Sequence, residues 1–371
     1  MIATQRLPAS LTPLDMALAA LLRGLAPVAP VALPLLEALG CIVADMPPLR
    51  AYPPRDIAAG DGWALRARDL VGASSYSPLP LAKPPVWVEA GEPMPEACDC
   101  VVDADSVDRT GPMFEALAEA IPGQGVRRIG HEIAEGNFIA SGRRVRPLDL
   151  LMARAAGMQE LNVRRPRLRV VNIPATGEAV TAPLIAESAG MAGADVVRVE
   201  AAARDAESIA KALDAGACDL LLTVGGSGVG RGDAAIAALA QCGEMIVHGV
   251  ALQPGRTCAI GRIGETSVIA LPGAPDQALA AWWTLVLPAL DRLAVRQPRQ
   301  AITLPLQRKI ASSVGIAEIV LVERRDGGWM PLASGDLSLA TIARADAWLV
   351  VPGGSEGFAA GAPVNAYMLR D

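Results

Sequence analysis

The chain has 371 residues, which is too long for one ordinary hydrophobic core, so two to four domains are expected. Hydrophobic residues make up 52% of the chain and aromatic residues only 3%, so the cores must be built mainly from Ala, Val, Leu and Ile. The formal net charge of −6 argues against nucleic acid as a bulk partner. No apolar run reaches membrane-spanning length and the N-terminal residues show no secretion signal, so we expect a cytoplasmic protein without a membrane partner.

The basic residues and the cysteines limit the kinds of binding site that this chain can form. Lysine occurs only at Lys83, Lys211 and Lys309, so any anion site must depend on arginine, backbone amides or distant lysines. The cysteines lack the second pair or the nearby histidine that zinc spacing requires, so we expect buried structural thiols. They are Cys41, Cys98, Cys100, Cys218, Cys242 and Cys258.

The first elements along the chain are helical. A helix is predicted over 12–22, with Thr12 as its cap and Pro13 in its first turn. A shorter helix is predicted over 33–39. The proline-rich segment 47–54 then marks a boundary.

Short strands separated by turns follow, and they predict a small β-rich domain over 51–139. The predicted strands include 85–89, 100–103, 126–129 and 138–139. A helix over 148–156 could pack with the N-terminal helices. The β-rich domain would then be an insertion in a discontinuous helical linker domain formed by 1–50 and 140–166.

From residue 167 the pattern alternates between strand and helix, which predicts a mostly parallel α/β sheet covered on both faces. The predicted strands are 168–173, 194–200, 220–224, 245–250 and 268–271, and the predicted helices are 179–189, 205–215, 234–240 and 276–293. We assign this α/β domain to 167–297. Strand-like runs within 298–371 predict a C-terminal β domain.

The stretch 223–233, TVGGSGVGRGD, joins a predicted buried strand to a helix. Its glycines permit positive φ and close backbone approach, and the N–H groups of the loop and of the helix N-terminus favour an anion. A tight turn without a ligand is the alternative. No Gly-Lys-Ser/Thr follows, which excludes a P-loop ATPase.

Other loops of the same domain could converge with it, because ligands of parallel sheets bind at the carboxyl ends of the strands. They are 174–178, which offers the hydroxyl of Thr176 and the amide of Gly177, together with 271–275 and 253–257. Arg256 in the last of these supplies a positive charge. Together these loops predict a phosphate-containing ligand.

Acidic residues near such loops hold Mg²⁺ or transfer protons, although a solvated surface role is the alternative for each. The candidates are Asp61, Glu132, Glu178 and Asp233. His131 and His248 have no serine or cysteine partner at a readable spacing, so a hydrolytic triad is unsupported.

Taken in order, these motifs resemble the molybdopterin molybdenumtransferases, represented by bacterial MoeA and the gephyrin E domain. The resemblance rests on LPLLEALG at 33–40, DGWA at 61–64, GEPMP at 91–95, VRRIGHEI at 126–133, the glycine loop, HGVA at 248–251, PGAP at 272–275 and SG at 334–335 with 343–352. It implies a four-domain homodimer whose α/β domain binds molybdopterin. The implied reaction inserts molybdate into adenylylated molybdopterin with release of AMP, helped by a divalent cation such as Mg²⁺.

The resemblance also implies roles for individual residues. Asp61, Glu132, Glu178 and Asp233 would be the acidic active-site members, with Asp61 and Asp233 also holding the metal. Arg256 and Ser334 would meet molybdate. The substrate would be bound by Thr176, Gly177, Gly225, Gly226, Ser227, Gly228, Gly230, Pro272, Gly273 and Pro275. Partners would include the adenylyltransferase that supplies the substrate and a client molybdoenzyme.

Several positions depart from the family pattern. Ala179 replaces a glutamate, and Gln253 and Thr257 lie in the element that usually carries two lysines, leaving Arg256 as its cation. Asp276 places a carboxylate where an oxyanion would need donors. The departures favour, as an alternative, a catalytically weakened carrier or chaperone that holds molybdopterin for one client enzyme. A purely structural partner is a third hypothesis.

Overall fold

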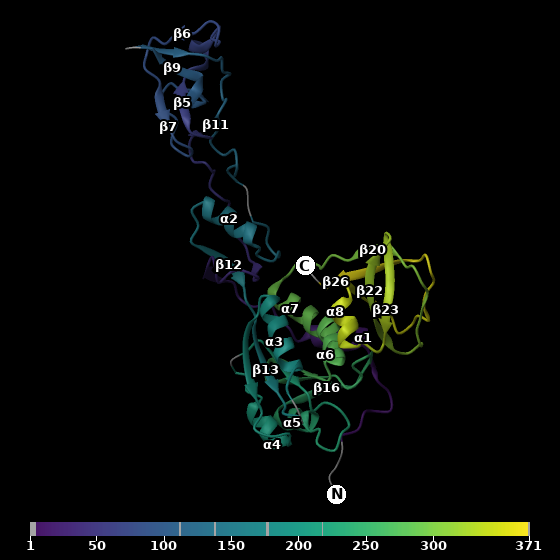
Figure 1. The fold of residues 1–371 in the computed structure, drawn as a ribbon. Coiled ribbons are helices and arrows are strands. Elements are labelled where there is room, and N and C mark those ends of the chain that lie inside the picture. Colours follow the sequence, from purple (N-terminus) through teal and green to yellow (C-terminus); the bar gives the residue numbers. More distant parts are fainter. Residues whose placement is uncertain (1–4, 111–112, 137–138, 176–177, 217, 370–371) are drawn as a thin grey trace.

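The computed structural model describes residues 5–110, 113–136, 139–175, 178–216 and 218–369. The chain is elongated, with a β-rich end and an α/β end joined by a thin middle section that contains α2 and β12 (Figure 1). Within the described residues, no helix is long and apolar enough to cross a membrane. The helices are α1 (Leu14–Arg23), α2 (Pro147–Ala155), α3 (Thr181–Met191), α4 (Ala206–Ala212), α5 (Ala235–Cys242), α6 (Pro275–Ala281), α7 (Leu287–Ala294) and α8 (Leu339–Arg344).

The central sheet confirms the predicted α/β pattern. Its order is β14 (Asp195–Glu200), β13 (Arg167–Asn172), β15 (Leu220–Val224), β19 (Thr266–Leu271), β18 (Ala259–Ile263) and β16 (Glu244–His248). The first four strands pair in parallel, and β18 and β16 add an antiparallel edge. Alternate strand residues point to opposite faces of a sheet, so Leu220 and Leu222 join one core with α3, α6 and α7 while Leu221 joins another with α4 and α5.

The C-terminal segment forms a second large sheet. Its order is β1 (Thr12–Pro13), β17 (Val250–Gln253), β22 (Ala317–Arg325), β24 (Ala347–Val351), β26 (Pro363–Met368) and β20 (Ile302–Pro305), with β23 (Gly328–Ser334) also paired to β22. A short pair, β21 (Ile310–Ala311) and β25 (Gly357–Phe358), accompanies it. The stacked rings of Trp283, Trp348 and Tyr367 join the helical layer to this sheet.

The remaining strands form small sheets. The middle section contains β2 (Val31–Pro34), β12 (Glu160–Arg164) and β3 (Ile42–Val43). The β-rich end contains β7 (Val86–Val88), β5 (Gly62–Leu65) and β8 (Cys100–Val102), then β6 (Leu79–Pro80), β10 (Met113–Ala116) and β9 (Val107–Thr110), and the pair β11 (Val126–Arg127) and β4 (Ile57–Ala58). The strand predicted over 138–139 includes a position outside the described residues.

Several sequence predictions were wrong in detail. The helix predicted over 33–39 is the end of β2 followed by a turn, because Leu33 pairs with Leu161 of β12. Thr12 does not cap α1, since it lies in β1 and pairs with Val250 of β17. The strand predicted over 245–250 divides at Gly249, whose φ of +84° turns the chain from one sheet into the other.

Two helices also differ from expectation. The helix predicted over 276–293 is interrupted by a π-helical segment, Trp282–Val286, just before Pro288, whose ring lacks an N–H donor and disfavours regular α-helix. Helix α1 packs in the core of the central sheet and contacts α7, whereas α2 belongs to a separate core in the middle section. The domain boundaries themselves stay predictions.

The cysteines are largely the structural thiols expected from the sequence. Cys41, Cys100, Cys218 and Cys258 are buried, and burial raises the pKa of each thiol, that of Cys100 to about 11. Cys98 is half-buried and Cys242 is exposed, so the prediction that all are buried was wrong at these two positions.

Candidate functional site

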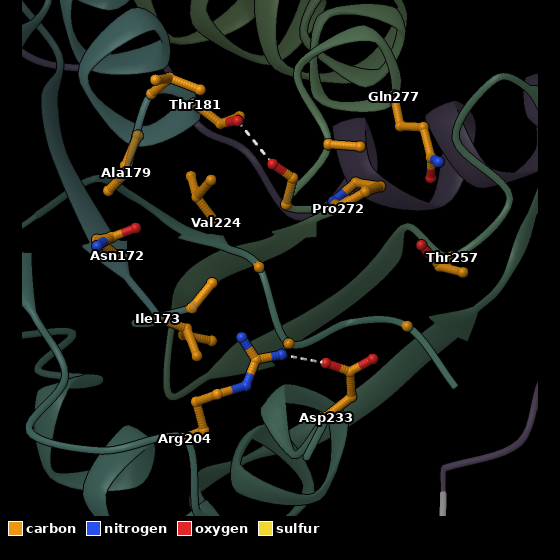
Figure 2. A pocket seen from close by; sticks show the side chains of 18 of the residues that line it. Asn172, Ile173, Ala179, Thr181, Arg204, Val224, Asp233, Thr257, Pro272 and Gln277 are labelled. Atoms are coloured by element: carbon orange, nitrogen blue, oxygen red, sulfur yellow. Dashed lines mark hydrogen bonds and ion pairs between the residues drawn. The ribbon is translucent and has the colours of Figure 1, made fainter. Parts of the chain in front are cut away.

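A cavity of about 460 Å³ lies at the carboxyl ends of β13, β15 and β19, where a parallel sheet is expected to bind its ligand (Figure 2). Its backbone walls come from the glycine loop and from the loop at Pro272 and Gly273. Its polar side chains come from several loops and helix ends that are far apart in the sequence. They are Asn172, Glu178, Thr181, Arg204, Asp233, Thr257 and Gln277.

The glycines at the start of the loop have a steric purpose. Gly225 and Gly226 adopt φ of +92° and +67°, a region that residues with a Cβ rarely adopt. A Cβ on Gly226 would lie 3.1 Å from Cδ1 of Ile173, and the amide of Gly225 donates to the carbonyl oxygen of Leu271 over 3.0 Å. Glycine therefore lets the chain turn tightly between two strand ends.

Free amides remain on this loop. Among the described residues, the N–H groups of Gly226, Ser227 and Gly228 have no protein acceptor. Gly226 and Gly228 line the cavity, whereas the side chain of Ser227 is buried and does not. Consecutive free amides form the kind of concave donor surface that binds anions.

The N-terminus of α5 has a different environment from the one expected. The side-chain oxygen of Gln5 accepts hydrogen bonds from the amides of Ile236 and Ala237, over 2.9 and 3.4 Å. The side-chain nitrogen of Gln5, Nε2, donates to the carbonyl oxygens of Gly226 and Gly228, over 3.0 and 2.8 Å. Gln5 thus caps the helix in place of the predicted anion, and the free loop amides are the better anion site.

Arg204 holds the other end of the glycine loop. It lies between β14 and α4, and its Nη2 donates to Oδ1 of Asp233 over 2.5 Å. Its Nη1 donates to the carbonyl oxygen of Pro174 over 2.9 Å, and its Nε donates to that of Gly232 over 3.3 Å. Oδ2 of Asp233 also accepts the amide of Gly230, over 2.9 Å. One guanidinium therefore joins the loop after β13 to the end of the glycine loop.

The remaining walls carry fewer charges. The hydroxyl of Thr181, at the start of α3, donates to the carbonyl oxygen of Gly273 over 2.6 Å and fixes the loop after β19. Ala179 and Thr257 line the cavity with small uncharged side chains. Glu178, one of the acidic candidates, also lines the cavity.

The predicted substrate-binding residues divide into three groups. Gly225, Gly226, Gly228, Pro272 and Gly273 line the cavity. Ser227, Gly230 and Pro275 do not, because Ser227 is buried beneath the loop, Gly230 binds Asp233 and Pro275 begins α6. Thr176 and Gly177 lie outside the described residues.

Arg256 and Ser334, predicted to meet molybdate, lie outside the cavity lining and are exposed. Each lies close in sequence to one partner of a hydrogen bond. In this bond the side chain of Gln253 donates to the carbonyl oxygen of Gly335 over 3.0 Å. This contact joins the end of β17 to the turn after β23. Gln253, at a position expected to hold lysine, thus has a structural partner.

Asp61 precedes β5 and Glu132 follows β11, so both belong to the β-rich end. Figure 1 shows this end far from the α/β end, whose residues line the cavity. Asp61 accepts the amide of Ala90 over 2.8 Å, and Glu132 pairs with Arg127 over 2.7 Å. The structure does not bring them to Asp233 within one chain.

The Mg²⁺ site that would use Asp61 and Asp233 does not fit the arrangement of one chain. The carboxylate of Asp233 is held by a guanidinium and an amide, and Asp61 lies in another part of the molecule. Across the described residues, no group of three or more His, Cys, Asp or Glu side chains could hold a metal.

Arg204 and Gln5 were not predicted as site residues. Arg204 had a readable signal, because it follows the predicted strand 194–200 and therefore belongs at the same edge of the sheet as the other loops. Gln5 had none, since its partners lie more than 220 residues away and no local pattern marks the contact.

Two family models and individual known proteins match this chain. Residues 12–157 match the MoeA N-terminal region (domain I and II), and residues 169–292 match the probable molybdopterin binding domain. The chain is 30% identical to molybdopterin molybdenumtransferase 2 of Mycobacterium tuberculosis over 314 residues, which cover 72% of this chain and 76% of that protein. It is 28% identical to the molybdopterin molybdenumtransferase of Synechococcus elongatus, over 92% of this chain and 95% of that protein.

The fold is also similar to a solved structure. The molybdopterin biosynthesis moeA protein of Pyrococcus horikoshii OT3 aligns with a TM-score of 0.70 and 23% sequence identity, over 97% of this chain and 100% of that one. This likeness supports the multidomain α/β and β architecture.

Proposed function

We propose that this chain, which belongs to the molybdopterin molybdenumtransferase family, inserts molybdate into adenylylated molybdopterin with release of AMP. It is a transferase of molybdenum cofactor biosynthesis. The observation that carries the proposal is the cavity at the strand ends, which is lined by Gly226 and Gly228, whose amides are free with respect to the described residues, and by Arg204. That donor set suits the phosphates that link adenosine to molybdopterin.

In the proposed reaction the loop amides and Arg204 bind the phosphates and fix their orientation. Departure of AMP leaves negative charge on its phosphate, and donors already aimed at that point stabilise the charge without reorganisation. Arg256 and Ser334, at the junction with the C-terminal sheet, would meet the incoming molybdate. For a divalent cation, implied by the family resemblance, the described residues of one chain offer no set of ligands, so no step is assigned to it.

The proposal includes a cytoplasmic homodimer. Asp61 and Glu132 lie far from the cavity of their own chain, so they can act there only from a second copy. The adenylyltransferase that makes the substrate and a client enzyme are proposed as functional partners. Sedimentation of the purified chain tests the dimer, which is overturned by a monomer at the concentration used for turnover.

The activity is tested by mixing the protein with adenylylated molybdopterin and following AMP with and without molybdate. We expect AMP release only with molybdate. Binding without molybdate-dependent release would make the protein a carrier, and the absence of binding would refute both roles.

Two glycine variants link the activity to the cavity. Gly226→Ala places a Cβ 3.1 Å from Ile173 at positive φ, and we expect it to slow AMP release. Gly72→Ala is the matched control, because Gly72 also has positive φ (+90°) and lies in the β-rich end, but a Cβ added there would meet no atom of the described residues within 4 Å. Equal loss in both variants would mean that the effect is general strain.

A further inference from the structure

Arg204 has more donors than its protein contacts use. A guanidinium carries five N–H donors, one on Nε and two on each terminal nitrogen. Its three hydrogen bonds, to Gly232, Pro174 and Asp233, take one donor from each nitrogen. With respect to the described residues, one N–H on Nη1 and one on Nη2 therefore remain available to a ligand.

Its position makes those donors useful. Arg204 lines the cavity, and Figure 2 shows its guanidinium directed toward Asp233 between the loop after β13 and the glycine loop. It is the only Lys, Arg or His among the described lining residues. A planar guanidinium whose neighbours fix it in place is pre-organised for bidentate binding of a phosphate.

The same contacts oppose a metal at this point. Mg²⁺ requires octahedral oxygen ligands at close range, whereas Oδ1 of Asp233 already accepts from the guanidinium and Oδ2 from the amide of Gly230. The side chain of Asp233 is only 14% exposed, so it has little room to rotate toward a cation. A dication beside Arg204 would also be repelled by its charge.

We infer that Arg204 is a phosphate-binding residue that takes the place of the divalent cation in this chain, so that the cavity binds a pyrophosphate group without metal. The inference rests on the proposed function for the identity of the ligand. Asp233 then serves as a positioning residue that holds the guanidinium, not as a metal ligand.

ADP is a suitable probe, because it carries the adenosine and the pyrophosphate of the proposed substrate. Calorimetric titration of the full chain with ADP should show binding in EDTA, with an affinity that added Mg²⁺ does not raise. For Arg204→Gln we expect the affinity to fall about tenfold to a hundredfold, which corresponds to about 1.4–2.8 kcal/mol. Arg204→Lys, which keeps the charge but loses the planar fork, should lie between the two.

Arg231→Gln is the matched control. Arg231 belongs to the same loop, is exposed and does not line the cavity, so the variant removes the same charge without removing a proposed ligand contact. Its ADP affinity should stay within about twofold of that of the unsubstituted protein, because salt screens an exposed surface charge. An equal fall in both variants would assign the effect to net charge and overturn the inference.

Asp233→Asn tests whether the carboxylate positions Arg204 or binds a metal, and this test does not depend on the folding of Arg204→Gln. If Asp233 positions Arg204, the variant keeps an acceptor and removes a negative charge near the phosphates, so ADP should bind up to about tenfold tighter in EDTA. If Asp233 is a metal ligand, ADP binding will depend on Mg²⁺ and the variant will abolish that dependence. Metal-dependent binding overturns the inference, whereas failure to release AMP from the substrate overturns the proposed function instead.

Discussion

Gln5 offers a direct test of what holds the glycine loop. Its side-chain amide makes hydrogen bonds to the amides of Ile236 and Ala237 and to the carbonyl oxygens of Gly226 and Gly228. Gln5→Ala removes all of these bonds at once. We expect the loop and the first turn of α5 to open more often, because the donors and acceptors lose their protein partners.

The expected change in hydrogen exchange can be worked out from the cost of losing a helix cap. Loss of a side-chain cap at a helix N-terminus costs about 0.5–2 kcal/mol, and water can partly replace the bonds at this half-buried position. Since 1.4 kcal/mol is a factor of ten, we expect hydrogen exchange at the amides of Ile236 and Ala237 to accelerate about tenfold. Amides in β15 should be unaffected, because that strand is fully buried between two cores.

Gln5→Glu distinguishes the bonds that Gln5 accepts from α5 from the bonds that it donates to the glycine loop. Its carboxylate keeps an acceptor for the helix amides and suits the positive end of α5, but it offers no donor to the carbonyl oxygens of Gly226 and Gly228. The helix amides should therefore stay protected while ADP binding at the loop weakens. Gln300→Ala, at an exposed glutamine, is the control. Unchanged exchange at Ile236 in Gln5→Ala would refute the capping role.

Other predictions concern stability. Burial of Asp149 favours its protonated form, but the hydrogen bonds from Arg146 outweigh this and lower its pKa below 3.8, so its contribution is complete above pH 3.8 and is lost as pH falls through the folded-state value. Asp149→Asn should cost about 1 kcal/mol at pH 7 and less near pH 3, as measured by urea unfolding; a constant difference would contradict this. Gly190→Ala in α3, where an added Cβ would meet no atom of the described residues outside the helix backbone within 4 Å, should raise the free energy of unfolding by about 0.5–1 kcal/mol, and a loss would show that the site is not open. Gly62→Ala would place a Cβ 2.2 Å from the carbonyl oxygen of Val102, so it should unfold the β-rich end while ADP binding persists; normal melting would refute that reasoning.

The parts of the fold that sequence predicted well have strong local patterns. The run over 220–224 is uniformly apolar and ends in glycines, and it is a fully buried strand of the central sheet. The segment over 33–39 is the contrary case. Its leucines have helical spacing, but Leu36 is 75% exposed and the preceding residues pair with β12. A strand partner more than 120 residues away decided that structure, and no local pattern reports it.

The site shows the same division. The loops at the strand ends could be placed from sequence, because parallel strands present their carboxyl ends at one edge. The contacts of Asp233 could not, since Arg204 approaches from another loop and gives the carboxylate a different partner. Asp61 and Glu132 were grouped with Asp233 as acidic candidates and by the family resemblance, and within one chain they lie in a different part of the molecule.

The glycine loop therefore depends on residues outside itself. Its glycines permit the turn, but Gln5 fixes one end and Arg204 fixes the other. This arrangement changes the meaning of the departures at Gln253 and Arg256, in the element that usually carries two lysines, because neither residue lines the cavity. If Arg204 binds the phosphates as inferred, affinity for the nucleotide part of the substrate does not require the missing lysines. The loss of these lysines would then weaken the later step, in which molybdate binds and is inserted. We therefore expect this protein to bind ADP normally but to turn over its substrate slowly.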